Sequence, residues 1–456
     1  MPSCIVSASF NLKDVKLLTW LQYFFLICPL GMIYCIMSEN LVKIIFRQTP
    51  ENRFTIPFLL NVLEKDNIDK NFSIQVVSSI DQLIKECKSA KPAIVAYSFM
   101  TPQMPEIWKE VQEIKKQLPK QAFLMAGGPH PSGSPEQTLQ MGFDMVIAGS
   151  AESVLTEAIQ KIIEKPNDTR NQVIDGGSVK QLDDFLPVSR TIPFIPPLEI
   201  MRGCYYRCGF CQTGQSQKPV YRSLDSVQFY LNKLIHRDLL FRTGFICPSG
   251  LEYHAARPGK PNLEKIESLL DMAKTIGIRY LEYGIFPSEI HPKTLSSEAL
   301  RLIRKYCSNQ KITLGAQSGS NEILKKLKRG HTTEDIEFAA DMICSQGFRP
   351  ILDFIIGFPE ETENDRQITL NWIRHLHTRY RARIQMHYFL PLAGTRFTDH
   401  KPTLPGLKSR ALLDAFYQGG ICTNWWRTGF KKSWALIRAR EALERTDSPS
   451  HYSFCD

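Results

Sequence analysis

Three cysteines in one short stretch constrain this chain more than any other feature. Cys204, Cys208 and Cys211 are spaced C-x3-C-x2-C within the segment MRGCYYRCGFC, directly after an apolar run at 198–201. A loop this short can direct three thiolates at one iron–sulfur cube and leave the fourth iron without a protein ligand. A structural zinc site usually takes four ligands, commonly from two C-x2-C pairs, and the sequence has no second pair. A disulfide explains the motif less well, because three clustered cysteines cannot all pair with one another.

The motif resembles the signature of the radical S-adenosylmethionine (radical SAM) superfamily, which has an aromatic residue before the last cysteine, here Phe210. The resemblance implies a 4Fe–4S cluster whose open iron chelates the amino and carboxylate groups of SAM. An electron from the reduced cluster then breaks the S–C5′ bond and yields a 5′-deoxyadenosyl radical, while the protein positions the cofactor. The resemblance also implies an electron donor such as ferredoxin or flavodoxin.

Composition limits the class of protein. At 456 residues the chain is long enough for two or three domains, and its apolar and charged fractions are typical of a globular protein. The net charge of +10 comes from scattered residues, with basic stretches only at 379–383 and 430–445, so a nucleic-acid partner is not indicated. The nine other cysteines are also scattered, which favours a reducing, cytoplasmic location.

The amino-terminal stretch 17–37 has no charged residue and is long enough to cross a bilayer as a helix. Lys13 and Lys16 precede it, as in a signal anchor, whereas Gln22 and Pro29 weaken the span. Alternatively, Met37 is the true start, and residues 1–36 are a mispredicted or loosely ordered extension. Both interpretations remain open, and membrane association is expected only through this stretch.

Residues 37–165 alternate between short apolar runs and amphipathic segments. The runs predict buried parallel strands at 41–46, 72–77, 93–99, 122–126 and 145–148. The segments predict helices at 56–64, 80–87, 106–117, 135–141 and 152–163. Five such units predict an α/β, doubly wound (Rossmann or flavodoxin-like) sheet, with a ligand crevice at the carboxyl ends of its strands.

Two turns at those strand ends resemble turns of the cobalamin-binding (B12-binding) domain that precedes many radical SAM domains. The first is Gly127-Gly128-Pro129-His130, and the second runs from Gly149 to Glu152. The resemblance implies that these residues contact cobalamin. The D-x-H-x-x-G motif that supplies a histidine to cobalt is absent, since the first loop has the sequence RQTPE at 47–51. We therefore expect His130 to be a turn residue and any bound cobalamin to lack a protein axial ligand.

A proline-rich linker is predicted at 166–197, followed by six strand–helix units at 198–397. Strands are predicted at 198–201, 244–247, 280–283, 312–317, 351–356 and 384–389. The radical SAM resemblance implies a partial (β/α)6 TIM-like barrel with its chemistry at the carboxyl ends of the strands. Residues 398–456 contain a helical stretch at 432–444 and are expected to form a carboxy-terminal helical cap.

The resemblance also implies which residues contact SAM. Gln317 and Ser318 match a fourth-strand motif, and Arg329 follows as the partner of the SAM carboxylate. Gly357 lies in a Gly-Phe-Pro-x-Glu-Thr motif whose backbone packs on adenine, and its Thr362 is expected to cap the next helix.

The second strand departs from the family pattern. Many relatives have Gly-Gly-Glu there to hold the SAM amino group, whereas this chain has Cys247-Pro248-Ser249-Gly250. Ser249 or a backbone carbonyl is expected to make that contact instead. No catalytic acid, base or thiol can be assigned from the sequence.

By resemblance, the leading hypothesis is a cobalamin-dependent radical SAM enzyme acting on an unidentified small molecule, by methyl transfer or by rearrangement. A tRNA methylthiotransferase-like enzyme is an alternative, but it predicts a second three-cysteine site in the amino-terminal domain and a β-rich tail. Only Cys87 occurs between residues 37 and 197, and the tail pattern is helical. A non-catalytic cobalamin or redox sensor is the third possibility, and the intact SAM-binding motifs argue against it.

Overall fold

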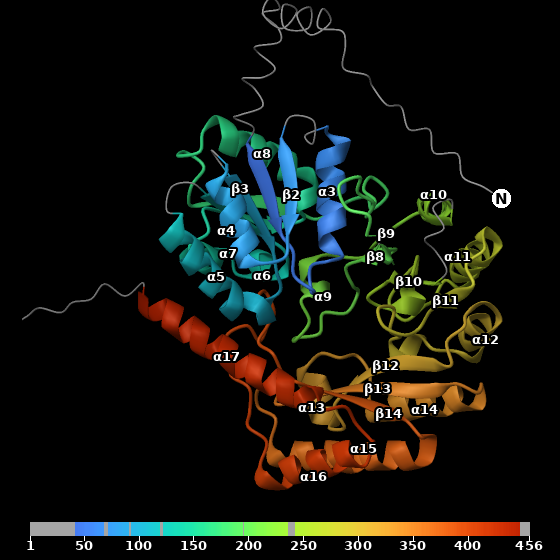
Figure 1. Ribbon diagram of the computed structural model, residues 1–456. Coiled ribbons are helices and arrows are strands. Elements are labelled where there is room, and N and C mark those ends of the chain that lie inside the picture. The colour runs from blue at the N-terminus through green and yellow to red at the C-terminus, as the bar shows by residue number, and fades with distance from the viewer. Residues whose placement is uncertain are drawn as a thin grey trace, which may run out of the picture.

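The computed structural model describes residues 42–67, 72–90, 93–118, 122–194, 196–235 and 242–446. The predicted extension at 1–36 and the apolar stretch at 17–37 lie outside these ranges. Within these ranges, no helix is both long enough and apolar enough to cross a membrane. The described chain forms two α/β lobes, an amino-terminal one drawn in blue to teal and a second drawn in green to orange (Figure 1).

The amino-terminal lobe is built on a parallel six-stranded sheet with the strand order β2-β1-β3-β4-β5-β6. Helices cover both faces: α4 and α5 enclose one apolar core, and α3 and α8 enclose the other. The predicted doubly wound fold is confirmed. Its strands are β1 Lys43–Arg47, β2 Ser73–Val77, β3 Ala93–Ser98, β4 Ala122–Gly127, β5 Met145–Gly149 and β6 Gln172–Gly177. Its helices are α3 Thr55–Lys65, α4 Ile80–Lys88, α5 Met104–Gln117, α6 Pro129–Gly133, α7 Pro135–Gln140 and α8 Leu155–Glu164, with short 3-10 turns η2 Thr101–Gln103 and η3 Ala151–Ser153.

Strand β6 differs from the expectation. The sequence predicts a linker over 166–197, whereas residues 172–177 pair in parallel with β5. The segment QVIDGG is largely exposed and polar, because it forms the edge of the sheet and buries little. An edge strand of this kind lacks the apolar run that identifies a central strand.

The second lobe is a partial barrel of six parallel strands. Its two three-stranded sheets, β11-β10-β7 and β12-β13-β14, are joined by a parallel bridge between Ile290 and Leu314. The predicted (β/α)6 arrangement is confirmed. The barrel strands are β7 Leu198–Glu199, β10 Arg242–Ile246, β11 Tyr280–Glu282, β12 Lys311–Gln317, β13 Arg349–Ile356 and β14 Arg383–Tyr388. The helices outside them are α10 Leu224–Ile235, α11 Leu263–Ile276, α12 Ser297–Tyr306, α13 Asn321–Lys326, α14 Thr333–Ser345, α15 Glu363–Tyr380 and α16 Leu407–Gln418.

Alternation along the strands decides which side chains face the barrel interior. On β13, Leu352, Phe354 and Ile356 are buried in the core shared with the outer helices. The intervening Asp353 and Ile355 therefore point to the interior, where both are partly accessible. Side chains at these interior positions can therefore contact a ligand bound inside the barrel.

The last helix, α17 (Trp425–Thr446), contacts both lobes (Figure 1). Trp426 joins the barrel core, and Gly429 packs closely on the Tyr388 backbone of β14. Further along the same helix, Leu436 and Leu443 are buried in the core that α4 and α5 enclose. The predicted helical stretch at 432–444 lies within α17, which covers β14 and fixes one lobe against the other.

Candidate functional site

The cysteine loop connects β8 (Met201–Arg202) to the short helix α9 (Thr213–Ser216). Strand β8 pairs with β9 (Val220–Tyr221), and Gly203 makes the turn with φ +83°. A side chain at 203 would meet the Lys218 carbonyl oxygen at 2.5 Å, so only glycine fits. All three cysteines are free thiols; Cys208 is buried, and Cys204 and Cys211 are half-buried.

Two tyrosines inside the loop anchor it to the segment after β10. The Tyr205 hydroxyl donates to the Ala255 carbonyl oxygen at 2.8 Å, and the Tyr206 hydroxyl donates to Glu252 Oε1 at 3.2 Å. The Tyr206 ring also stacks on His291, with 3.9 Å between ring centroids. On the other side, the Phe210 ring lies 5.6 Å from Phe358. These contacts hold the loop over the carboxyl ends of the barrel strands.

The arrangement of the cysteines bears on the zinc alternative. Among the described residues, no group of three or more His, Cys, Asp or Glu side chains converges on a point where one metal ion could be held. A mononuclear zinc site needs such convergence. An iron–sulfur cube does not, because its three thiolates bind three different irons. The loop therefore fits a cube better than a single ion.

Arg329, for which the sequence predicts a contact with the SAM carboxylate, lies beside the cysteine loop. Its Nη1 is 3.5 Å from Cys208 Sγ, and its Nη2 donates to the Gly315 carbonyl oxygen at 3.1 Å. Its Nε has no partner although it is buried. Burial and the charge of Arg329 lower the pKa of His291 to about 2, so this histidine is neutral beside the guanidinium. His291 Nε2 lies 3.3 Å from the Arg329 carbonyl oxygen and fixes the backbone there.

Buried polar atoms without a partner gather around this loop. Leaving such an atom unpaired costs about 1–3 kcal/mol, so a group of them at one place indicates a missing ligand. In the described part of the barrel they form a set near the strand ends, which is consistent with a polar ligand such as the SAM methionyl group. The set comprises Ser249 Oγ, Glu252 Oε2, His291 Nδ1, Gln317 Oε1, Arg329 Nε, His331 Nδ1 and Asp353 Oδ1.

The other predicted SAM contacts differ in their surroundings. Gln317 ends β12 with φ +68°, an unusual backbone conformation for a residue with a side chain. Ser318 is fully buried, and its Oγ accepts from Ser320 N and lies 3.3 Å from Thr369 Oγ1, so its hydroxyl is already satisfied. Gly357 ends β13 with φ +84°, and its N donates to Glu361 Oε2. The cap is confirmed, because Thr362 Oγ1 accepts from Asp365 N at the start of α15.

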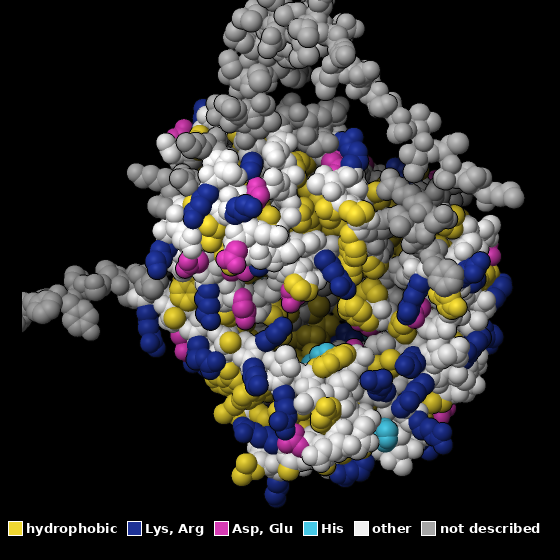
Figure 2. Space-filling view, in the orientation of Figure 1, with side chains coloured by type: hydrophobic (Ala, Val, Ile, Leu, Met, Phe, Trp, Pro, Cys, Tyr) yellow, Lys and Arg dark blue, Asp and Glu magenta, His cyan; other side chains and the backbone are white. Residues whose placement is uncertain are grey.

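A cavity of about 540 Å³ lies between the amino-terminal sheet and the cysteine loop. Figure 2 shows the surface hollowed between the two lobes, with apolar side chains inside the hollow. The carboxyl ends of β1, β3, β4 and β5 form one wall, and residues 212, 213, 216 and 217 of the α9 region form the facing wall. This is the crevice position expected for a doubly wound sheet. Its lining is mostly apolar and includes Phe46, Phe54, Phe58, Met125, Ile147 and Leu155.

Most of the residues predicted to contact cobalamin line this cavity, namely Gly127, Gly128, Pro129, Gly149 and Glu152. A Cβ at 127 would point into open space, with nothing nearer than 3.8 Å, so glycine there leaves room for a flat ligand. His130 lies behind the wall instead: it is fully buried, with Nδ1 3.3 Å from Thr101 Oγ1 and its ring stacked on Phe99. Burial and the charge of Arg440 lower the pKa of His130 to about 3.

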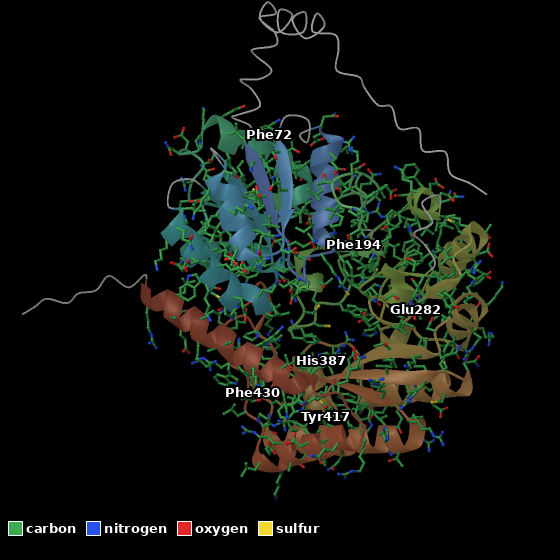
Figure 3. The ribbon with its side chains drawn as sticks, in the orientation of Figure 1. Phe72, Phe194, Glu282, His387, Tyr417 and Phe430 are labelled. Atoms are coloured by element: carbon green, nitrogen blue, oxygen red, sulfur yellow. The ribbon has the colours of Figure 1, made fainter. Side chains whose placement is uncertain are left out.

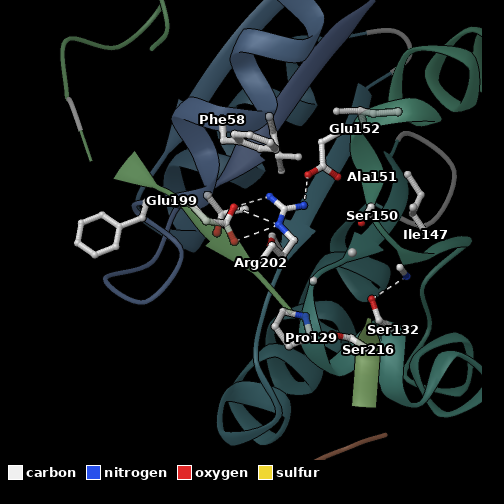
Figure 4. Close-up of a pocket in the computed structure, with 18 of the residues that line it drawn as sticks. Phe58, Pro129, Ser132, Ile147, Ser150, Ala151, Glu152, Glu199, Arg202 and Ser216 are labelled. Carbon is white, nitrogen blue, oxygen red and sulfur yellow. Dashed lines mark hydrogen bonds and ion pairs between the residues drawn. The ribbon is translucent and has the colours of Figure 1, made fainter. Parts of the chain in front are cut away.

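Arg202 was not identified from the sequence, yet it occupies the centre of the cavity wall (Figure 4). It contacts Glu152 of the amino-terminal lobe through Nη1 and donates to Glu199 at 2.6 Å through Nη2. Its guanidinium lies 5.5 Å from the centroid of the Phe58 ring. Burial alone would lower the pKa of Arg202, but Glu199 and Glu152 raise it above its usual value. The position of Arg202 directly before Gly203 and Cys204 was the available sequence signal.

Each of the two lobes matches the model of a known protein family. Residues 56–159 match the family model of the B12 binding domain, and residues 198–373 match that of the radical SAM superfamily. Radical SAM domains use a 4Fe–4S cluster and SAM, and B12-binding domains take cobalamin. The unpaired polar atoms near Cys208 and the glycine-lined cavity fit these groups.

Two curated relatives modify tRNA. The chain is 28% identical over 316 residues to the threonylcarbamoyladenosine tRNA methylthiotransferase MtaB of Aquifex aeolicus, covering 66% of this chain and 70% of that protein. It is 30% identical over 224 residues to a tRNA-2-methylthio-N(6)-dimethylallyladenosine synthase of Acinetobacter baumannii, covering 47% of this chain. The chain spans 44% of the length of that synthase.

Two solved structures share the two-lobed fold at 16% identity. The radical SAM methyltransferase TsrM from Kitasatospora setae, with cobalamin and a 4Fe–4S cluster bound, aligns with a TM-score of 0.58 over 88% of this chain and 91% of its own. The cobalamin-dependent radical SAM enzyme OxsB aligns with a TM-score of 0.53 over 75% of this chain and 53% of its own. The solved structures show the fold, and the two family models show that the chain carries a B12-binding domain ahead of a radical SAM domain.

Proposed function

We propose that this protein is a cobalamin-dependent radical SAM enzyme that transfers a methyl group to a carbon atom of a small molecule. The observation that carries the proposal is the position of the 540 Å³ cavity, which opens between the glycine-lined strand ends and the cysteine loop. A corrinoid in this crevice would lie beside residues 202 and 203, which precede the cysteines, and residues 212 and 213, which follow them. Rearrangement of a small molecule is the rival outcome for the same architecture.

In the proposal, each part of the chain has a separate task. Cys204, Cys208 and Cys211 hold the cluster, and Arg329 orients SAM by its carboxylate through charge-assisted hydrogen bonds. The bound cofactors supply one-electron cleavage of SAM and a transferable methyl group. The aromatic side chains that line the crevice exclude water from the reacting groups. Arg202 keeps the crevice wall and the cysteine loop together through Glu152 and Glu199.

A tRNA methylthiotransferase activity is the second candidate, because the relatives named above carry that name. Such an enzyme would use a second cluster in its amino-terminal domain. Between residues 42 and 197, apart from the undescribed gaps, the one cysteine is Cys87, and it is fully buried in the core under α4. Because apolar residues of this core surround Cys87, we expect it to pack in the core and not to bind a second cluster.

The test uses anaerobically reconstituted protein, SAM with a deuterated methyl group, and a cell extract divided into small molecules and tRNA. We expect bound corrinoid by absorbance, formation of 5′-deoxyadenosine, and deuterated methyl groups only among the small molecules. Label in the tRNA fraction would instead support the methylthiotransferase. SAM cleavage without any labelled product would support rearrangement. If the Cys208→Ala variant cleaved SAM as fast as the wild type, the radical SAM assignment would be overturned.

Two substitutions of Gly127 test whether the corrinoid binds in the crevice. Gly127→Phe places a ring in the cavity, whereas Gly127→Ala adds one methyl group where nothing lies nearer than 3.8 Å. We expect the phenylalanine variant to lose bound corrinoid at least tenfold and to keep its iron content, and the alanine variant to keep both. Equal corrinoid binding by the two variants would place the corrinoid elsewhere.

A further inference from the structure

Arg329 contacts the sulfur atom of one of the three cysteines assigned to the cluster. Its Nη1 lies 3.5 Å from Cys208 Sγ, and Cys208 is buried. An N–H group of a guanidinium at this distance can donate a hydrogen bond to the sulfur. The role considered so far for Arg329 concerns the SAM carboxylate, whereas this second contact concerns the cluster itself.

The backbone that carries Arg329 is attached to the cysteine loop. Arg329 lies in the turn after α13, and the carbonyl oxygen of Leu327 in this turn accepts from Gly209 N at 2.8 Å. Gly209 directly follows Cys208 in the chain. His291 Nε2 lies 3.3 Å from the Arg329 carbonyl oxygen and fixes the turn from its other side. The main chain therefore places the guanidinium beside Cys208.

Strand β12 fixes the orientation of the guanidinium. Nη2 of Arg329 donates to the Gly315 carbonyl oxygen at 3.1 Å. A Cβ on Gly315 would meet the same Nη2 at 2.6 Å, so the guanidinium occupies space that is free only because residue 315 is glycine. Since the guanidinium is a rigid planar fork, holding Nη2 on the strand also sets the direction in which Nη1 points. That direction leads to Cys208 Sγ.

The sulfur contact leaves enough N–H groups for a SAM carboxylate. A guanidinium has five N–H donors, and the Gly315 carbonyl oxygen and Cys208 Sγ use one each. The remaining donors include Nε, which is buried and has no partner. A carboxylate can therefore bind the guanidinium while the contact with sulfur is kept. The two contacts of Arg329 do not exclude each other.

A hydrogen bond to a thiolate sulfur changes how easily an iron–sulfur cluster accepts an electron. Reduction adds one negative charge to the cluster and its thiolates, and a cationic N–H donor stabilises the more negative form. The effect requires a contact that water does not screen. Arg207, which directly precedes Cys208, carries the same charge but is exposed to solvent, so its influence is screened. Arg329 meets the requirement through its contact with a buried sulfur atom.

We propose that Arg329 raises the reduction potential of the 4Fe–4S cluster through its hydrogen bond to Cys208 Sγ. The step it favours is the transfer of one electron from an external reductant to the oxidised cluster, in which no covalent bond forms or breaks. A higher potential lets a given reductant reduce a larger fraction of the clusters. The inference rests on the proposed function only for the cluster on the three cysteines, and it is independent of methyl transfer.

The experiment is an anaerobic redox titration of the reconstituted full chain without SAM. Photoreduced deazaflavin is the reductant, electron paramagnetic resonance measures the reduced cluster, and iron and sulfide contents are determined for each sample. Arg329→Met removes the hydrogen bond and the charge. Gly315→Ala keeps the arginine and displaces its guanidinium, because the added Cβ would lie 2.6 Å from Nη2.

Two control variants remove a positive charge without removing a contact to sulfur. Arg207→Met is the matched control, because Arg207 belongs to the cysteine loop and is exposed. Arg242→Met is the remote control, because 66% of the Arg242 side chain is exposed and its partner is Glu282 of β11, labelled in Figure 3. These variants measure how much of any effect comes from net charge alone.

We expect the equilibrium constant for cluster reduction to fall at least fivefold in Arg329→Met, where a tenfold fall corresponds to about 59 mV for one electron. Gly315→Ala should lower it at least twofold, and both controls should stay within twofold of the wild type. A fall of less than fivefold in Arg329→Met, or an equal fall in Arg207→Met, would overturn the proposal. If Arg329→Met takes up no iron, Gly315→Ala decides, and a wild-type potential in that variant would overturn it.

The titration separates this inference from the proposed function, because it contains neither SAM nor substrate. A wild-type cluster that is reduced normally but supports no methyl transfer would count against the proposed function and leave the comparison of variants intact. A wild-type protein that takes up no 4Fe–4S cluster would overturn both.

Discussion

At the scale of single residues, the burial of a charged side chain decides how much its ion pair contributes to the stability of the fold. Arg202 lies between Glu152 and Glu199, and the side chain of Glu152 is only 6% exposed. Arg242 donates from Nε and Nη2 to one oxygen of Glu282, Oε2, but 66% of the Arg242 side chain is exposed. Removing one partner of a buried ion pair leaves an uncompensated charge, whereas water replaces a partner at the surface.

We therefore predict that Arg202→Met destabilises the protein by about 3 kcal/mol and weakens corrinoid binding. Arg242→Met removes the same charge from an exposed pair and should leave stability unchanged. Urea unfolding of the cofactor-free protein, followed by circular dichroism, measures both. Equal midpoints for the two variants would mean that the Arg202 contacts do not hold the lobes together.

At the scale of elements, helix starts at the ends of barrel strands position the site. The loop from Gly357 to Thr362 links β13 to α15, and Thr362 and Asp365 form a capping box at its end. This cap satisfies backbone N–H groups of the first turn and fixes where the loop ends. The geometry of the Gly357 backbone depends on that loop.

Thr362→Ala should cost about 1 kcal/mol of stability, because the alanine cannot accept from Asp365 N. Thr362→Ser keeps the hydroxyl and should restore most of the loss. Thermal unfolding of the two variants beside the wild type provides the comparison. A serine variant as unstable as the alanine variant would point to the Thr362 methyl group instead of the cap.

At the scale of the whole molecule, α17 connects two cores that the chain otherwise joins through the segment before β7. Leu436 is fully buried against the amino-terminal lobe, whereas Trp426 of the same helix belongs to the barrel core. A helix that belongs to both cores couples their stabilities. It also limits how far the crevice between the lobes can open.

Leu436→Ala should reduce the stability of the amino-terminal lobe by about 2–5 kcal/mol, the usual cost of a buried leucine truncation. We expect proteolysis to cut this lobe before the barrel in the variant, with both lobes resistant in the wild type. Leu407→Ala is the control, since Leu407 is 85% exposed. Simultaneous cleavage of both lobes in Leu436→Ala would show that they unfold as one unit.

The sequence by itself determined the features that depend on neighbouring residues. The spacing of Cys204, Cys208 and Cys211, the βα alternation and the Thr362 cap all follow from local rules, because each involves residues within a few positions or one regular period. The helix α17 was also visible as an amphipathic stretch. Strand β6 was not, because its exposed edge carries no apolar period.

Only the tertiary structure decided which distant residues meet. Asp353 lies near Glu289 and Gln317 because parallel register and the Ile290–Leu314 bridge bring three segments together. Arg202 reaches Glu152 because α17 and the crevice walls hold the lobes side by side. His130 sits behind the crevice for the same kind of reason, since its side chain turns toward Thr101 and Phe99. Such contacts depend on the packing of whole elements, which no local pattern in the sequence records.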